Sequence, residues 1–286
     1  MNWLEYGNRL IRGVLNARGV ASRTFRVRDL DVHAYHYTGT GSGPPLMLVH
    51  GLGSSANAFF RTIIPLGKTF REVWVPDLPG NGFSPMPEGG PRPLQELVEV
   101  LLEFRRSVVG ERVFLVGNSL GGAMSLYAAS QEPDAFVGLA LVSPAGARLS
   151  QEQLDSVTAA FRVTTTGEAR GLARRLFARP PRSVLLFADE LKKMVSTDTV
   201  QSIVDNVTAA DAVTEEMLGR ITMPSLVLWG GRDKLLPPES VAYFRAHLPK
   251  SAEVTEVEGF GHMPQMEHPR QFVKRLTDFV RRHALA

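Results

Sequence analysis

Three short runs of consecutive apolar residues constrain the fold of this chain more than any other feature of its sequence. They read Leu-Met-Leu-Val at 46–49, Val-Phe-Leu-Val at 113–116 and Leu-Ala-Leu-Val at 139–142. A strand that is apolar at every position, rather than at every second position, is buried on both of its faces. Such strands are typical of a parallel sheet that is covered by helices on both sides and connected by right-handed crossovers.

The rest of the chain continues this alternation of strands and helices. We predict strands at 31–37, 46–50, 72–76, 112–117, 137–142, 226–229 and 253–257. Three of these strands are the apolar runs, lengthened by one or two residues. Helical periodicity predicts core helices at 93–109, 121–131, 238–247 and 269–283. The predicted fold class is therefore α/β, with a mostly parallel central sheet flanked by helices.

The alternation stops between about residues 147 and 222, where helical patterns follow one another without a clear strand. We predict helices in this region at 151–161, 168–177, 182–196 and 199–206. An insertion of this kind is expected to cap the carboxyl edge of the sheet, where ligands bind in open α/β sheets. The predicted organisation is an N-terminal amphipathic helix at 1–24, a core at 25–146 and 223–286, and a helical cap at 147–222.

Composition excludes several classes of protein. The 286 residues are 44% hydrophobic and 21% charged, which is ordinary globular usage and excludes a disordered chain or a coiled coil. A formal net charge of +3 does not indicate a nucleic-acid partner. The chain has no cysteine, and its seven histidines lack the spacing of zinc ligands, so we expect neither a metal nor an organic cofactor. Without a long apolar run or a secretory pattern, we expect a soluble, cytoplasmic protein.

The N-terminal segment at 2–18 has the pattern of an amphipathic helix, with apolar residues three and four positions apart and arginines between them. The apolar residues are Trp3, Tyr6, Leu10, Ile11, Val14 and Leu15. The favoured interpretation is a helix docked on the body of the protein. The alternative is a weak contact with a lipid surface, because Trp, Tyr and Arg are suited to a membrane interface.

The most specific catalytic signal is Gly-Asn-Ser-Leu-Gly at 117–121, which follows a predicted strand and begins a predicted helix. A serine on such a turn projects above the sheet, and glycines two residues on either side let the strand and the helix approach closely. We therefore predict that Ser119 is a nucleophile. The backbone N–H of Leu120, at the start of the helix, is expected to stabilise an oxyanion.

A nucleophilic serine needs a base, and the base needs a group that orients it. His262 lies in a glycine-rich loop directly after the strand at 253–257, where functional loops are expected. Asp233 follows the strand at 226–229 and is the candidate to hold His262 in the correct tautomer. The alternative for Asp233 is a turn aspartate that pairs with Arg232 or Lys234.

A second oxyanion donor should come from the loop after an early strand. That loop reads His-Gly-Leu-Gly-Ser-Ser at 50–55, and the backbone N–H of Leu52 is the candidate. His50 has the side chain of a general base, but we prefer the interpretation that it braces the loop through hydrogen bonds.

Together these stretches resemble the α/β-hydrolase fold superfamily over nearly the whole chain beyond residue 25. The matching stretches are 50–53, Asp-Leu-Pro-Gly-Asn-Gly-Phe-Ser at 77–84, 117–122, Trp-Gly-Gly-Arg-Asp at 229–233 and Gly-His at 261–262. The resemblance implies a triad in the chain order Ser, Asp, His. It also implies that Asp77 organises a turn. The chain departs from the pattern at Asn81, where relatives commonly carry histidine or another residue, but this position has no role in the triad.

Within the superfamily, Leu-Val-Ser-Pro-Ala-Gly at 141–146 is similar to the branch of carboxylesterases and monoacylglycerol lipase-like enzymes. That similarity implies a serine hydrolase for carboxylic esters, which holds an acyl chain under the cap and works through an acyl-enzyme. The expected partner is a small-molecule ester, with no nucleic acid.

A second candidate is a carbon–carbon hydrolase of the meta-cleavage-product type, since 117–119 and 265–268 are similar to that family. Its oxyanion loop usually reads His-Gly-x-Gly-Pro-Gly and its histidine is usually followed by Trp, whereas this chain has Ser54, Ser55 and Met263 at these places. A third candidate is a non-catalytic ligand-binding module on the same fold, in which the triad is usually broken.

Two further patterns lie in the cap. The run Val-Leu-Leu-Phe-Ala at 184–188 is apolar all round, which predicts burial between cap and body. A set of arginines is expected to form a solvated face, or alternatively to attract an anionic substrate or membrane; it comprises Arg170, Arg174, Arg175, Arg179 and Arg182.

Overall fold

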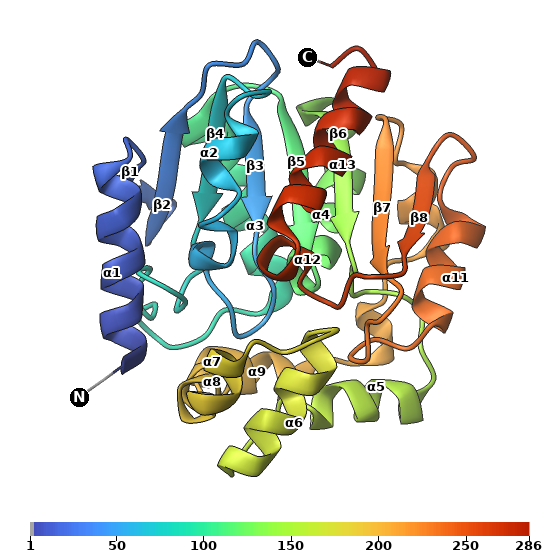
Figure 1. The fold of residues 1–286 in the computed structure, drawn as a ribbon. Coiled ribbons are helices and arrows are strands. Elements are labelled where there is room, and N and C mark those ends of the chain that lie inside the picture. Colours follow the sequence, from blue (N-terminus) through green and yellow to red (C-terminus); the bar gives the residue numbers. More distant parts are fainter. Residues whose placement is uncertain (1–2, 286) are drawn as a thin grey trace.

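The computed structural model describes residues 3–285, whose strands form one eight-stranded sheet (Figure 1). The strands are β1 (Ala21–Val27), β2 (Leu30–Thr38), β3 (Leu46–Val49), β4 (Glu72–Pro76), β5 (Val113–Asn118), β6 (Phe136–Val142), β7 (Ser225–Gly230) and β8 (Glu253–Val257). Their order across the sheet is β1-β2-β4-β3-β5-β6-β7-β8. Pairing is parallel from β4 to β8, while β2 is antiparallel to both of its neighbours.

Helices cover both faces of this sheet. The helices of the core are α1 (Trp3–Ala17), α2 (Ile63–Leu66), α3 (Leu94–Phe104), α4 (Leu120–Gln131), α11 (Glu239–His247), α12 (Pro264–Glu267) and α13 (Pro269–Arg282), and the short helical turns are η1 (Ala56–Phe59), η2 (Arg105–Val109) and η3 (Pro133–Ala135). Helices α3 and α4 lie on one face, and α2 and α13 lie on the other (Figure 1).

The two-sided cover explains the apolar runs that predicted the fold. In β3, the side chains of Leu46 and Leu48 join the apolar cluster beneath α2 and α13, whereas Met47 and Val49 join the cluster beneath α3 and α4. All four are fully buried. Each position of such a strand therefore needs an apolar residue, because neither face of the sheet meets solvent here.

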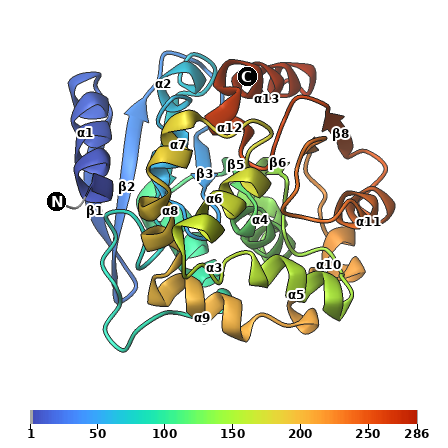
Figure 2. The ribbon, with the colours of Figure 1, turned by 60° about the horizontal axis from the view of Figure 1, so that its bottom comes forward.

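A helical insert between β6 and β7 lies across the edge at which the parallel strands end (Figures 1 and 2). It consists of α5 (Gln151–Ala159), α6 (Thr166–Leu176), α7 (Arg182–Leu186), α8 (Ala188–Val195), α9 (Asp198–Asn206), η4 (Ala209–Asp211) and α10 (Glu215–Gly219). The predicted α/β class, the mostly parallel sheet and the helical insert are thus confirmed. The numerical boundaries given above for core and cap remain predictions.

The structure contains one strand that was not predicted, and it divides one predicted helix in two. Strand β1 was not expected, because it is an edge strand with mostly polar side chains, of which only Val27 is buried, and it lacks the apolar pattern of the buried strands. It starts at Ala21, within the segment 1–24 that was predicted as the N-terminal unit. The single helix predicted at 182–196 is two helices, which meet at Phe187, where φ is −98° and ψ is 35°.

The prediction that the run 184–188 is buried is wrong for its middle. Ala188 is fully buried, but Leu186 is 73% exposed and Phe187 is 48% exposed. The run is apolar for two different reasons, since one part packs inward and the other faces outward. Hydrophobic periodicity alone does not separate these two cases.

The N-terminal helix is present as α1, although position 2 of the predicted segment lies outside the described residues. Leu15 is fully buried and Ile11 is half-buried against the body, so the helix is docked as expected. Tyr6, Leu10 and Val14 remain exposed on its other side.

The start of α6 generates a prediction about the stability of the cap. The Thr165 hydroxyl accepts a hydrogen bond from the Glu168 N–H at 3.2 Å, and the Glu168 carboxylate accepts from the N–H of Thr164 and of Thr165. These backbone bonds lower the pKa of Glu168 to about 2. Because the pKa is lowered, the stabilisation is complete above the usual carboxyl range and is lost as the pH falls toward 2.

We expect Thr165→Ala to lower the free energy of unfolding by about 1 kcal/mol at neutral pH, measured by denaturant titration and by faster amide exchange in α6. Thr197→Ala is the matched control, because Thr197 precedes α9 without a capping bond from its side chain. Equal losses in the two variants would contradict the assignment.

Candidate active site

Ser119 lies on a strained turn between β5 and α4. Its backbone has φ 56° and ψ −120°, a conformation that costs energy for a residue with a side chain. A Cβ at Gly117 would lie 2.2 Å from the Gly121 carbonyl oxygen, and a Cβ at Gly121 would lie 2.4 Å from the Val49 oxygen. Only glycine fits at both positions. The strand and the helix therefore approach each other as closely as the sequence pattern predicted.

His262 and Asp233 are joined by a short hydrogen bond. The loop after β8 carries His262, and its Nδ1 is 2.7 Å from Asp233 Oδ2, in the loop after β7. The other carboxylate oxygen of Asp233 accepts bonds from the N–H groups of Leu235 and Leu236 at 2.8 and 3.2 Å. Among the described residues, Asp233 has no ion pair with Arg232 or Lys234, the partners in the alternative interpretation.

The surroundings of this pair favour a charged carboxylate and an available imidazole nitrogen. Burial raises the pKa of Asp233, but the charge and hydrogen bond of His262, together with the two backbone N–H groups, outweigh it and hold the pKa below its usual range. His262 Nε2 is buried and has no hydrogen-bond partner within residues 3–285. His262 and Ser119 line the same cavity, so Nε2 is placed to accept a proton from a group in that cavity.

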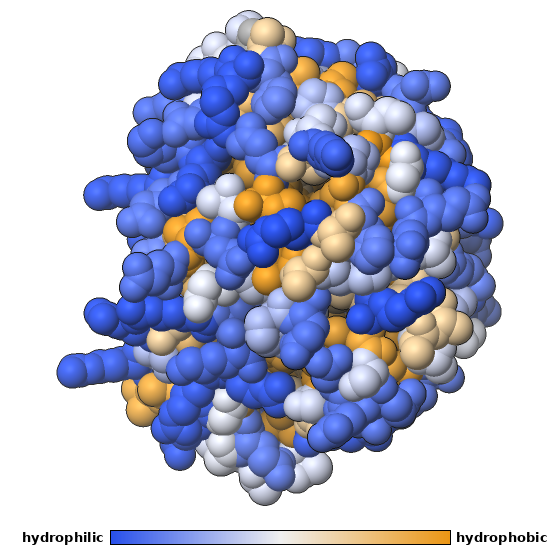
Figure 3. Space-filling view, turned by 90° about the vertical axis from the view of Figure 1, so that its right-hand side faces the viewer, coloured by the Kyte–Doolittle hydropathy of each residue, from blue (hydrophilic) through white to orange (hydrophobic). Residues whose placement is uncertain are grey.

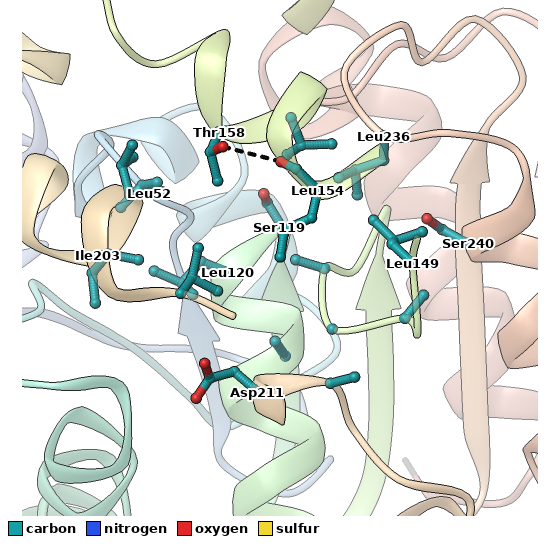
Figure 4. Close-up of a pocket in the computed structure, with 18 of the residues that line it drawn as sticks. Leu52, Ser119, Leu120, Leu149, Leu154, Thr158, Ile203, Asp211, Leu236 and Ser240 are labelled. Carbon is teal, nitrogen blue, oxygen red and sulfur yellow. Dashed lines mark hydrogen bonds between the residues drawn. The ribbon is translucent and has the colours of Figure 1, made fainter. Parts of the chain in front are cut away.

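The two candidate oxyanion donors lie beside the serine. Leu120 is the first residue of α4, so its N–H has no carbonyl of a preceding turn to bond. The loop that carries Leu52 passes directly against Ser119, because a Cβ at Gly51 would lie 3.0 Å from Ser119 Cβ. The side chains of Leu52 and Leu120 both border the cavity at Ser119 (Figure 4).

His50 braces the loop at 50–55, as expected. Its Nε2 accepts a bond from the Leu78 N–H at 3.0 Å, so Nδ1 carries the proton and donates to the Gly51 carbonyl at 2.9 Å. Burial lowers the pKa of His50, which favours this neutral form. Both nitrogens are occupied, so His50 is not available as a base.

Asp77 organises a turn, as the resemblance implied. Its carboxylate accepts bonds from the N–H groups of Ala56 and Phe83 at 2.7 and 2.9 Å, and from His33 Nδ1 at 2.7 Å. These contacts join Asp77 to β2, to η1 and to the turn at 77–84.

Two buried amides connect the serine turn to the histidine loop. The Asn118 side chain donates to the Val142 carbonyl at 2.9 Å and to the His262 carbonyl at 3.0 Å. Gln265 orients it, because Gln265 Nε2 donates to Asn118 Oδ1 at 2.9 Å. These residues were not predicted as part of the site. Their signal in the sequence is their position, because Asn118 directly precedes Ser119 and Gln265 follows His262 by three residues.

The cap is also bonded to the histidine loop. The His262 N–H donates to the Leu176 carbonyl at the end of α6, at 2.9 Å. The Glu267 carboxylate accepts from the N–H groups of Gly261 at 3.0 Å and Arg179 at 3.2 Å. Burial raises the pKa of Glu267 against these bonds. The segment that leaves α6 therefore helps to fix the position of His262.

Two apolar chambers meet at Ser119. The first, here called the α5–α9 chamber, has a volume of about 120 Å³ and is shown in Figure 4; its lining includes Leu149, Leu154, Val157, Ile203 and Asp211. The second, here called the α1–α8 chamber, has a volume of about 330 Å³; its lining includes Asn8, Ile11, Phe187, Met194 and His262. Ser119, Leu52 and Phe161 border both chambers.

No lysine or arginine of the described chain lines either chamber. The carboxylates that do line them are Asp211 in the first and Glu190 in the second. Within residues 3–285 there is also no group of three or more histidine, aspartate or glutamate side chains arranged to hold a metal ion. The site is therefore suited to a neutral, apolar ligand.

A model of the alpha/beta hydrolase fold family matches residues 44–269, which include Ser119, Asp233 and His262. The chain belongs to this family. Lipase 1 of Psychrobacter immobilis is 26% identical over 91% of this chain and 84% of its own length. The 2-hydroxy-6-oxo-2,4-heptadienoate hydrolase of Pseudomonas putida is 28% identical over 84% of this chain and 90% of its own.

Solved structures share the fold of this hydrolase. Naproxen esterase from Bacillus subtilis superposes with a TM-score of 0.74 at 20% identity, covering 95% of this chain and 96% of the esterase. Relatives at this distance thus include esterases, lipases and carbon–carbon hydrolases, so the family assignment alone does not define the substrate.

The amide bridge yields a prediction for the active site. We expect Asn118→Ala to slow acylation of Ser119 by a fluorophosphonate probe by about 100-fold, because the His262 loop loses its bond to the serine turn. The probe reports the reactivity of the serine without requiring a substrate. Asn206→Ala, the same change at an exposed position of the cap, serves as the control for general effects. Wild-type labelling of a folded Asn118→Ala protein would show that the bridge does not position the site.

Proposed function

We propose that this α/β-hydrolase cleaves neutral carboxylic esters through an acyl-enzyme. Ser119 Oγ attacks the ester carbonyl while His262 Nε2 takes its proton, and the Leu120 and Leu52 N–H groups stabilise the oxyanion. His262 then donates the proton to the leaving alcohol. A water molecule activated by His262 releases the acid, and Asp233 stabilises the imidazolium in both steps.

The observation that carries this proposal is the absence of lysine and arginine from the described lining of both chambers. A dienoate substrate of a carbon–carbon hydrolase carries a carboxylate. Burying that carboxylate beside Asp211 or Glu190 without a cationic partner would be strongly unfavourable. A neutral ester carries no such cost, which supports an esterase over the carbon–carbon alternative.

The two chambers also suggest how the substrate is oriented. His262 lines only the α1–α8 chamber, and it must reach the oxygen of the leaving alcohol. We therefore place the alcohol part in the α1–α8 chamber and the acyl part in the smaller α5–α9 chamber. The acyl part is then the more restricted of the two.

The first test is hydrolysis of p-nitrophenyl esters from acetate to palmitate. We expect turnover with a preference for the shorter acyl chains, and none above background with Ser119→Ala. Asp233→Asn should lower kcat by about 10⁴-fold, because the imidazole loses the partner that fixes its tautomer. Turnover of dienoates but not of esters would favour the carbon–carbon hydrolase. A protein that is labelled by the fluorophosphonate but has neither activity would indicate a cap that admits a narrower range of substrates. A folded protein that is not labelled would favour a binding module.

A matched pair of cap variants tests the orientation. Leu154 and Met194 are both half-buried residues of the cap, one in each chamber. We expect Leu154→Trp to shift the acyl-length optimum to shorter chains, since it fills the α5–α9 chamber. Met194→Trp should leave that optimum unchanged and lower kcat/KM for esters of bulky alcohols. The opposite pattern would reverse the two assignments.

A further inference from the structure

Most of the exposed large apolar side chains belong to two segments of the described chain. The large apolar residues most exposed among those described are Tyr6, Leu10, Val14, Met86, Leu186 and Phe187. Three belong to α1, and two lie at the end of α7. Single exposed apolar residues are ordinary, but a contiguous group of them marks an interaction site.

The three exposed apolar residues of helix α1 form a stripe. Tyr6, Leu10 and Val14 are four residues apart, so they lie one above the other along the helix. Leu15 and Ile11, which dock the helix on the body, lie on the other side. The stripe is apolar although about half of each of its side chains is exposed, which a further contact surface would explain.

Both elements border the same cavity. Asn8 and Ile11 of α1 and Val184 and Phe187 of the α7 segment line the α1–α8 chamber, which ends at Ser119. Figure 2, which brings the side with the cap forward, shows α1 at one edge of the view and the α7–α8 segment nearer its centre. We call the outward side chains of Tyr6, Leu10, Val14, Leu186 and Phe187 the α1–α7 face. It flanks the chamber through which a ligand reaches the serine.

The charges beside this face favour an anionic surface as its partner. In the segment 3–19, three arginines (Arg9, Arg12 and Arg18) outnumber the single acidic residue Glu5. Glu5 pairs with Arg9, and Arg12 lies over the Phe83 ring, so the segment keeps a net positive charge. Arg182 begins α7 and is also exposed. Arginines at the border of an apolar stripe are the arrangement by which an amphipathic helix binds an anionic lipid surface. The side of the molecule that carries β8 and α11 differs, since hydrophilic side chains project over most of it (Figure 3).

We propose that the α1–α7 face docks on the surface of an anionic lipid bilayer. Helix α1 would lie in the plane of the interface, and no helix of the described chain is long and apolar enough to cross a membrane. A neutral lipid ester would then pass from the bilayer into the α1–α8 chamber. The docking itself does not depend on the proposed function, whereas the delivery of an ester to Ser119 rests on it.

The test is co-sedimentation of the full chain with vesicles of phosphatidylcholine alone and of phosphatidylcholine with an equal amount of phosphatidylglycerol. We expect binding to the mixed vesicles that weakens with added salt. The double variant Leu10→Glu/Leu186→Glu should lower the partition coefficient about tenfold or more, because it places charges on the apolar stripe. Gln131→Glu/Ser251→Glu adds the same two negative charges at exposed positions outside the stripe, and should bind nearly as well as wild type.

Two readouts keep this proposal separate from the proposed function. Ser119→Ala should bind vesicles normally, and Leu10→Glu/Leu186→Glu should hydrolyse a short soluble ester at the wild-type rate, since neither side chain lines a chamber. Absence of wild-type binding, or equal loss in the stripe and control variants, would overturn the docking. So would a dimer in solution that the stripe variant dissociates, because a second copy of the chain would then occupy the face. Vesicle binding without any esterase activity would overturn only the proposed function.

Discussion

The close contact between β3, the Ser119 turn and α4 is the constraint on which the rest of the site depends. Gly117 and Gly121 allow the backbones to approach where no Cβ would fit, and this approach forces Ser119 into a positive φ. The strain is sustained by a fully buried sheet on both sides of the turn. The rigid core therefore holds the candidate nucleophile, Ser119, in position. The loops around Ser119 are positioned relative to this core.

Much of this arrangement follows from local sequence. The buried strands are recognisable because both of their faces need apolar residues, and the glycines at 117 and 121 are recognisable because a tight turn requires them. Asp233 and His262 could be paired in advance because each follows a strand that ends at the same edge of the sheet. The structure joins these two residues by a hydrogen bond, while the catalytic roles of Ser119, Asp233 and His262 remain proposals.

Other features depend on contacts that local sequence does not encode. Strand β1 has no apolar signature because it pairs only at the edge, and its place is defined by β2. Asn118 and Gln265 meet across 147 residues of chain. The apolar run at 184–188 shows the limit most directly, because a buried side chain and an outward-facing one have the same chemical character, and only the neighbouring elements tell them apart.

The bond between the His262 N–H and the Leu176 carbonyl has a consequence for how this enzyme fold can be altered. The end of α6 belongs to the cap, yet it is also part of the scaffold of the imidazole. Exchanging the whole cap for that of another hydrolase would therefore disturb the position of His262 together with the lining of the chambers. Within the described chain, no hydrogen bond joins α5 or α9 to the histidine loop, although both helices line a chamber. Recombination limited to these two helices would therefore vary the pocket while Ser119 and His262 keep their positions.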